Sequence, residues 1–205
     1  MLYELAHTIQ KNAPWIWEGV EGLNTLLFRL RVEKRRLRLA DCCPEGVRVA
    51  DERDAAALAE FFKRQPDEAF RWFKPHAFDE ETLRKLLRKD TYIIYIEEVD
   101  GAIAGYAFLR CFFHGRCFLG KMVDVNHQGR GICTRLCAVG MEMAEVLGLR
   151  MFESINKENV GSMRASEKAC DVVVVEELEN GDVLIEDYKK GSLKRKEGQD
   201  GKMAF

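Results

Sequence analysis

A glycine-rich turn between a predicted strand and a predicted helix places the strongest constraint on how this chain folds. The turn is residues 128–133, Gln-Gly-Arg-Gly-Ile-Cys, and residues 118–125 before it read as a β-strand. After the turn, apolar residues recur at helical spacing as far as Val146, and Gly148 is placed to end the helix. The first turn of such a helix offers unpaired N–H groups and the positive end of the helix dipole. The turn therefore predicts a binding site for a phosphate-bearing ligand.

Two common phosphate-binding loops do not fit these residues. A Walker-type loop ends in Gly-Lys-Ser or Gly-Lys-Thr, which residues 128–134 lack. A dinucleotide fingerprint needs a third glycine where Thr134 stands. The turn instead resembles the pyrophosphate loop of the GNAT superfamily of acetyl-CoA-dependent N-acetyltransferases, Gln/Arg-x-x-Gly-x-Gly/Ala. Gln128 and Gly131 match this pattern, and Cys133 replaces its last small residue.

A second motif of the same family follows at the expected distance. Residues 151–155 read as a strand, and residues 159–162 supply the pattern Asn-x-x-Ser/Ala. Residues 166–171 then stand in register with the family's Tyr-Glu-Lys-x-Gly-Phe. Glu167 and Lys168 match this half of the motif; the positions that differ are Ser166, Cys170 and Asp171. Two motifs in the right order and spacing indicate membership of the GNAT superfamily.

The order of predicted elements agrees with this resemblance. Strands are predicted at 47–50, 92–98, 104–113, 118–125, 151–155, 172–176 and 183–187. A helix capped by Asp51 or Asp54 and a second helix near 79–88 follow the first strand. The fold class expected from the resemblance is α/β (α+β), a mixed, mostly antiparallel twisted sheet with helices on both faces. We predict three parts: an N-terminal helical extension (1–45), a GNAT domain (46–190) and a polar tail (191–205).

The predicted extension carries two features of its own. Two amphipathic stretches, broken near Pro14, carry Leu2, Leu5, Ile9, Ile16, Val20, Leu23, Leu27 and Leu30. A basic run follows, with Arg29, Arg31, Lys34, Arg35, Arg36 and Arg38. One interpretation is a helical extension packed on the domain with a solvated basic face. The other is contact with an acidic membrane surface or a partner protein, which Trp15, Trp17 and Phe28 favour.

Composition narrows the possible functions. The 205 residues are enough for one domain with an extension, and a formal net charge of −2 gives no overall attraction for nucleic acid. The seven cysteines form no Cys-x-x-Cys pair near a histidine, so we expect no metal site. Nothing resembles a signal peptide, and no apolar run approaches the ~20 residues that span a bilayer. We expect a cytoplasmic protein of unknown oligomeric state.

The resemblance implies acetyl-CoA as cosubstrate. Backbone N–H groups of the turn would bind the pyrophosphate, the backbone of Val123 and Val125 would pair with the pantetheine arm, and Asn159 would hydrogen-bond that arm. Arg130 would add charge near the phosphates, or would be an ordinary solvated side chain at a helix start. The residues implied to bind the coenzyme are Val123, Val125, Gln128, Gly129, Arg130, Gly131, Ile132, Cys133, Asn159 and Ser162.

Proton handling departs from the family pattern. The family's general acid is a tyrosine at the position of Ser166, and its strand glutamate corresponds to Cys117. Either Ser166 is the acid, or water or another residue is, or a thiolate of pKa ~8.5 leaves unaided. The candidate bases are Asp124, Glu153, His76 and His114, and a histidine suits this role near neutral pH. Asp124, His76 and Ser166 are our catalytic candidates, although Asp124 could instead cap a loop and His76 could be a packing residue.

The acceptor side indicates only the character of a substrate. Trp72, Phe73 and His76 are the candidate substrate-binding residues, in a segment that could wall an aromatic pocket or close the core. We predict an N-acetyltransferase that moves an acetyl group from acetyl-CoA directly to a primary amine of a small molecule. The alternative is a GNAT-like acyl-CoA-binding or regulatory module with little catalysis.

Overall fold

The computed structural model describes residues 14–193, with side chains from residue 19 onward. Its α-helices are α2 (Pro14–Arg36), α3 (Ala55–Lys63), α4 (Glu80–Leu87), α5 (Ile132–Leu147) and α6 (Val160–Ala169). Its strands are β1 (Val47–Val49), β2 (Tyr92–Val99), β3 (Ala102–Phe112), β4 (Arg116–Val123), β5 (Arg150–Asn156), β6 (Cys170–Glu177) and β7 (Asp182–Lys189). Short 3₁₀ helices are η1 (Leu39–Cys42), η2 (Glu52–Asp54), η3 (Asp67–Phe70) and η4 (Val125–His127). No helix within 14–193 has the length and apolar character to cross a membrane.

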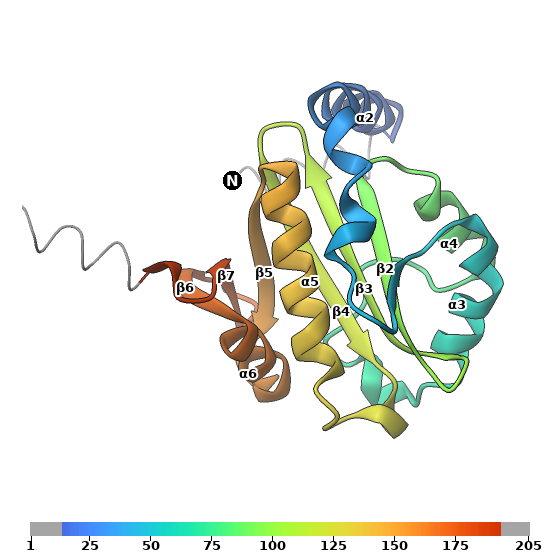
Figure 1. The fold of residues 1–205 in the computed structure, drawn as a ribbon, viewed down its shortest axis with the longest axis vertical. Helices are drawn as coiled ribbons and strands as arrows, with labels where there is room; N and C mark the ends of the chain where they lie inside the picture. The colour runs from blue at the N-terminus through green and yellow to red at the C-terminus, as the bar shows by residue number, and fades with distance from the viewer. Residues whose placement is uncertain (1–13, 194–205) are drawn as a thin grey trace, which may run out of the picture.

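One seven-stranded sheet, in the order β1-β2-β3-β4-β5-β7-β6, organises the molecule (Figure 1). Neighbouring strands are antiparallel except β4 and β5, which are parallel. The parallel pairing is short, because only residues 116–118 of β4 face residues 150–152 of β5. Beyond it, β4 continues beside β3 and β5 continues beside β7. We call the opening between residues 119–123 and residues 153–156 the β4–β5 splay.

Helices cover both faces of the sheet and form a core on each. Tyr95, Leu109 and Leu136 belong to the core on the side of α5 and α2. Phe61 and Tyr106 belong to the core on the side of α3 and α4. Side chains alternate between these cores because successive residues of a strand point to opposite faces. The predicted fold class is confirmed: the sheet is mixed and mostly antiparallel, with helices on both sides.

The predicted strands and helices are found in their predicted order, with one correction beside the glycine-rich turn. The strand expected at 118–125 ends at Val123. Asp124 then accepts a hydrogen bond from the Asn126 amide and caps η4, which runs from Val125 to His127. An acidic side chain that bonds the backbone two residues later favours a turn over an extended strand. Val125 therefore lies in a 3₁₀ turn rather than on the strand.

Helix α2 packs on the domain through a face other than the predicted one. Phe28 and Val32 are fully buried in the core beneath α5. The predicted apolar stripe faces outward, and its exposed members include Val20, Leu23 and Leu30. The amphipathic stretch predicted before Pro14 and most of the predicted tail lie outside the described residues. The three-part division at residues 45 and 190 stays a prediction.

Half of the basic run bonds to the domain. Arg31 donates to the carbonyl oxygens of Phe113 (2.8 Å) and Gly148 (3.1 Å), and Arg35 donates to that of Leu147 (3.0 Å). Leu147 ends α5, where unpaired carbonyls and the negative end of the dipole favour a cation. Arg36 forms an ion pair with Asp90. The side chains of the run that remain exposed include Arg29, Lys34 and Arg38.

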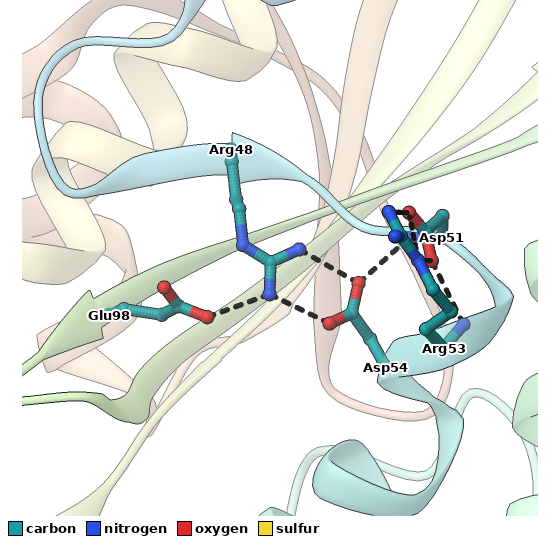
Figure 2. Close-up of polar contacts among 5 residues, drawn as sticks. All are labelled: Arg48, Asp51, Arg53, Asp54 and Glu98. Atoms are coloured by element: carbon teal, nitrogen blue, oxygen red, sulfur yellow. Dashed lines mark hydrogen bonds and ion pairs between the residues drawn. The ribbon is translucent and has the colours of Figure 1, made fainter.

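A guanidinium joins β1 to the start of α3 and the end of β2 (Figure 2). Arg48 donates to both carboxylate oxygens of Asp54 (2.8 and 2.7 Å) and to Glu98 Oε1 (2.7 Å). Asp51 caps η2, and its own amide donates to Asp54 Oδ2 (2.8 Å). The pKa of Asp54 is lowered, first by its bond from Arg48. Arg48 therefore satisfies a mostly buried carboxylate at the junction of three elements.

Replacing Arg48 with methionine is expected to lower the free energy of unfolding by about 1–3 kcal/mol, because Asp54 loses a bidentate partner. Urea denaturation at pH 7 measures this change. Arg53→Met is the matched control, since Arg53 pairs with Asp51 at the surface with its side chain 90% exposed. No measurable change is expected for the control. Equal effects of the two substitutions would contradict the assigned role of Arg48.

Candidate active site

The glycine-rich turn forms the N-terminus of α5 and leaves its amides open. Gly129 and Gly131 have φ of +75° and +79°, in the left-handed region that favours glycine. Among residues 14–193, no hydrogen bond is donated by the backbone amides of residues 129–134. The first turn of α5 also lies close to β3. A Cβ atom added at Gly105 would come within 2.6 Å of Ile132 Cγ2. A compact, positively polarised backbone cradle suited to an anion results.

A buried carboxylate holds the start of this loop. Asp124, 2% exposed, accepts hydrogen bonds from Arg64 Nε (2.7 Å), Gln65 Nε2 (3.1 Å) and the Asn126 amide (2.9 Å). Burial alone would raise the pKa of Asp124, but its bonds from Arg64, the Asn126 amide and Gln65 lower it to about 2. A carboxylate held in this way is a weak base at neutral pH. These contacts favour a positioning role for Asp124 over the predicted catalytic one.

The groups predicted to contact a pantetheine arm differ in whether they are free to bond a ligand. Val123, the last residue of β4, pairs with Gly105 of β3 on one side and borders the splay on the other. The Val125 amide donates to Gln65 Oε1 (3.1 Å), so it is already used. Asn159 caps α6 by accepting from the Ser162 amide (3.3 Å), and no bond from its own Nδ2 is found in the described residues. Val123 and Asn159 therefore keep open hydrogen-bonding capacity, whereas Val125 does not.

A buried polar cluster lies where β4 and β5 separate. Lys121 of β4 forms an ion pair with Glu153 of β5, and both side chains are only 3% exposed. Lys121 Nζ also donates to Ser166 Oγ of α6 (2.9 Å), and Ser166 Oγ donates to Glu153 Oε1 (2.8 Å). Asp187 of β7 is 2% exposed, and neither of its carboxyl oxygens has a hydrogen-bond partner among residues 14–193. We call Lys121, Glu153, Ser166 and Asp187 the splay cluster.

Within the splay cluster, the pKa values of Lys121 and Asp187 are both raised. Burial alone would lower the pKa of Lys121, but Cys137, Glu153 and Cys133 raise it, so the ammonium stays charged. Burial and the negative charge of Glu153 raise the pKa of Asp187 to about 8. The cluster therefore combines an ammonium that keeps its charge with a carboxyl group that holds its proton more strongly than an ordinary aspartate. Perturbed titratable groups of this kind gather at functional sites.

His76 lies on the opposite face of the sheet, among aromatic rings. Its Nδ1 is 2.8 Å from the carbonyl oxygen of Ala77, and its Nε2 is 2.9 Å from the Tyr106 hydroxyl. A carbonyl only accepts, so the neutral ring carries its proton on Nδ1 and accepts from Tyr106 at Nε2. Burial lowers the pKa of His76. His76 is therefore neutral at pH 7 and Nε2 is its basic nitrogen.

The predicted acceptor residues do not form one pocket. Phe73 is half-buried, with its ring centroid 6.2 Å from that of Phe78 and 6.3 Å from that of Tyr106. Trp72 is 40% exposed, and Arg71 stacks on its ring at 4.5 Å. Phe73 therefore closes the core beside His76, as the alternative interpretation expected. Trp72 lies at the surface.

The structure brings together some sequence-predicted residues and separates others. Ser166 and Glu153 meet in the splay cluster, whereas His114 stacks on Phe112 at the β3–β4 turn. Cys117 is fully buried, and burial raises the pKa of its thiol. Sequence reasoning missed the part played by Lys121, the signal for which was a lysine inside an otherwise apolar strand. It also missed Asp187, which follows Glu186 near the end of β7 and has no distinguishing signal in the sequence.

Comparisons with known proteins place the chain among acetyltransferases. Residues 46–169, more than half of the chain, match the family described as acetyltransferase (GNAT) domain. No curated protein sequence matches the chain significantly. The structure is similar to the GNAT domain of Streptomyces lividans PAT, with a TM-score of 0.61 at 19% identity over 69% of this chain and 89% of that one.

Two further solved structures are similar at low identity. One is aminoglycoside acetyltransferase AAC(6')-Ib with coenzyme A and kanamycin, with a TM-score of 0.56 at 16% identity over 74% of this chain and 98% of that one. The other is a chimera of spermidine N-acetyltransferase SpeG from Vibrio cholerae with hSSAT. It has a TM-score of 0.57 at 18% identity over 70% of this chain and 93% of that one. At these identities the likeness shows a shared fold.

Proposed function

Because the chain belongs to the GNAT acetyltransferase family and is an acyltransferase, we propose that it transfers an acetyl group from acetyl-CoA directly to the primary amine of a small molecule. The observation that carries this proposal is the continuity of two open backbone surfaces. The unbonded amides of residues 129–134 lie at the end of β4, whose residues 119–123 lack a partner on the β5 side. Together they suit a pyrophosphate joined to an extended amide-containing arm.

The coenzyme-binding residues are proposed in two groups. Gln128, Gly129, Arg130, Gly131, Ile132 and Cys133 would surround the pyrophosphate with backbone N–H groups, and Arg130, which is exposed, would add charge. Val123 would pair with the arm along β4, and Asn159 would donate from Nδ2 at the start of α6, beside Ser162. Val125 joins this group only if its amide exchanges Gln65 for the coenzyme. Acetyl-CoA supplies the acetyl group as an activated thioester.

The acceptor amine is proposed to approach from the face of α3 and α4. Similar structures come from proteins named for aminoglycoside and spermidine acetylation, which favours a small polyamine or amino sugar as acceptor. A new C–N bond forms as the C–S bond breaks, the sulfur keeps the electron pair, and the amine loses one proton. His76 Nε2 is the proposed base for that proton once the Tyr106 hydroxyl, which donates to it, gives up that bond; His76 is neutral at pH 7 and half-buried on this face. Phe73, which packs beside Tyr106, would be one wall of the acceptor site, and Trp72 would border it at the surface.

Acetyl-CoA turnover with a panel of amines, including kanamycin and spermidine, tests this function. We expect calorimetry to detect CoA binding and at least one amine to be acetylated. CoA binding without transfer to any amine would favour the alternative, an acyl-CoA-binding or regulatory module. Absence of CoA binding would contradict both.

A pH profile tests the role of His76. We expect wild-type kcat/KM to rise with pH through a pKa below the usual ~6.5, because the neutral ring is the active form. His76→Gln should lower kcat/KM by about a hundredfold and remove this acidic limb. His114→Gln, at the exposed β3–β4 turn, is the control. A His76→Gln enzyme with an unchanged acidic limb would contradict the assignment.

The outward face of α2 supports a separate proposal, contact with an anionic membrane surface. Val20, Leu23, Leu26 and Leu30 of α2 are each more than half exposed, and Val20 and Leu23 also border a pocket with Tyr92 and Phe112. Arg29 and Lys34 are exposed on the same helix, and neither forms an ion pair within the described part of the chain. Apolar side chains bordered by basic ones fit acyl chains bordered by anionic headgroups.

Sedimentation with phosphatidylserine-containing vesicles tests this contact. The wild-type protein should sediment with these vesicles and less with phosphatidylcholine alone, and the variant Leu23→Glu/Leu30→Glu should remain in solution. Val174→Glu on β6 is the control, since Val174 is 56% exposed elsewhere. Equal sedimentation of wild type and variant would remove the membrane proposal. If, without vesicles, the variant has a lower molecular mass in solution than the wild type, a second copy of the chain covers this face.

A further inference from the structure

Lys121 is a buried cation at the edge of the splay. Its side chain is 3% exposed although the residue as a whole is half-buried, so its exposed surface belongs to the backbone of β4. An ammonium has three donors, and two are used within residues 14–193, by Glu153 Oε2 and Ser166 Oγ. Burying an ion pair costs desolvation energy, and apolar residues of similar volume often stabilise a fold as well. One N–H donor of a costly buried cation is therefore left for a ligand.

The position of Lys121 relative to His76 suits a reaction across the sheet. Met122 of β4 belongs to the core beneath α3 and α4, where His76 also lies. The neighbouring Lys121 points to the other face, where it meets α6. His76 thus lies on one face of the sheet, beside Tyr106 and Phe108 of β3, and the Lys121 ammonium of the neighbouring strand lies on the other face, against α6. An amine entering from the first face would leave the sulfur on the second.

Ser166 does not supply a free proton at this point. Its hydroxyl donates to Glu153 Oε1 (2.8 Å), and Lys121 donates to it. Its other contacts within the described residues are the Ser162 carbonyl at 3.2 Å and Cys137 Sγ at 3.9 Å, where either atom could be the donor. The serine that stands where the family has a tyrosine thus holds the ammonium and carboxylate in place. Ser166 is therefore better suited to positioning these two groups than to the predicted acid role.

We propose that the Lys121 ammonium, held by Glu153 and Ser166, contacts the coenzyme sulfur and stabilises the thiolate as the C–S bond breaks. This inference rests on the proposed acetyl transfer. The electron pair of the C–S bond goes to sulfur, the proton of the amine goes to His76, and Lys121 keeps its proton. Lys121 acts by charge because its neighbours keep it protonated. A fixed cation where negative charge develops lowers the barrier without reorganisation. Glu153 and Ser166 are positioning residues.

The pKa of the bound CoA thiol measures this contact without measuring turnover. Ultraviolet thiolate absorbance of the protein with CoA is followed against pH, and the same protein with desulfo-CoA is subtracted to remove the protein thiols. A cation within about 4–6 Å should lower the thiol pKa by about 1–3 pH units from that of free CoA. The other titratable groups around Lys121 are Glu153, Asp187, Cys133, Cys137 and Cys170.

Variants separate charge from folding. Lys121→Met would leave Glu153 buried without a partner, so Lys121→Met/Glu153→Gln is the primary variant, because it removes both charges together. We expect its bound thiol to titrate like free CoA and its kcat to fall about a hundredfold, with little change in the KM for acetyl-CoA. Lys121→Arg should keep most of the thiol shift. Lys85→Met, at an exposed ion pair on α4, is the control.

The outcomes separate this inference from the proposed function. Wild-type protein that binds CoA with an unshifted thiol pKa would overturn the role of Lys121 and leave acetyl transfer intact. The same conclusion follows if the double variant keeps the shift. Wild-type protein that binds no CoA would overturn the proposed function itself. If the double variant does not fold, the thiol titration of the wild-type protein by itself still tests the role of Lys121.

Discussion

Replacing Gly131 with valine is expected to weaken CoA binding by about a hundredfold, because two or more hydrogen bonds to a charged pyrophosphate are lost. Gly131 has φ +79° and is the N-cap residue of α5. A β-branched residue is strained at this angle, and its Cβ would lie 3.2 Å from Arg135 Nη1. The loop must therefore change its backbone, which turns the amides that follow away from a common point. Fold stability should change far less, because the cores on both faces of the sheet do not include Gly131.

Calorimetric titration with CoA measures this effect. Gly191→Val is the matched control, because Gly191 has φ +81° and no atom within 4 Å of a Cβ, after β7 and away from α5's first turn. Both substitutions impose the same backbone strain of about 1–2 kcal/mol. Only Gly131→Val should lose affinity. Comparable CoA affinity in both proteins would show that the turn does not bind the pyrophosphate.

Local patterns were enough to predict the turn and most elements around it. The turn combines a strand, two glycines and a helix within about 30 residues, so neighbours in sequence are also neighbours in space. The hairpin at Asp100 and Gly101 and the end of α5 at Gly148 follow the same rule, and both glycines have positive φ. The two-residue error at the end of β4 came from Asp124, whose side chain bonds the backbone locally. Strand propensity alone does not register such a bond.

Residues defined by long-range contacts were not predictable in the same way. Lys121 meets Glu153 and Ser166 only after β4, β5 and α6 come together, and no pattern within a single segment places the three side chains beside one another. The docked face of α2 was missed for a related reason. Its outward leucines form the more regular apolar stripe, whereas Phe28 and Val32 are buried by the domain's surface rather than by helical periodicity. Likewise Arg31 and Arg35 read as solvated until the carbonyls at the end of α5 are placed beside them.

The fold should lose stability as pH rises from about 5 to about 8, and Asp187→Asn should remove that loss. Asp187 has a pKa of about 8 in the folded protein, against ~3.9 for an unperturbed aspartate. Between these values the folded state holds a proton that the unfolded state has released, so each rise in pH favours unfolding. A single such proton costs up to about 1.4 kcal/mol per pH unit. In the Asp187→Asn variant this side chain is uncharged at every pH and has nearly the same shape as aspartate.

Urea denaturation at a series of pH values between 5 and 9 measures this effect as a difference between proteins. His76 works in the opposite direction, because its lowered pKa adds stability as pH rises, and it contributes equally to wild type and variant. The difference between the two curves therefore isolates Asp187. Glu179→Gln, at the exposed turn before β7, controls for the loss of one carboxylate. Parallel curves for wild type and Asp187→Asn would mean that Asp187 is ionised when buried. Lys121 would then face two carboxylates, and its charge would be neutralised rather than directed at a ligand.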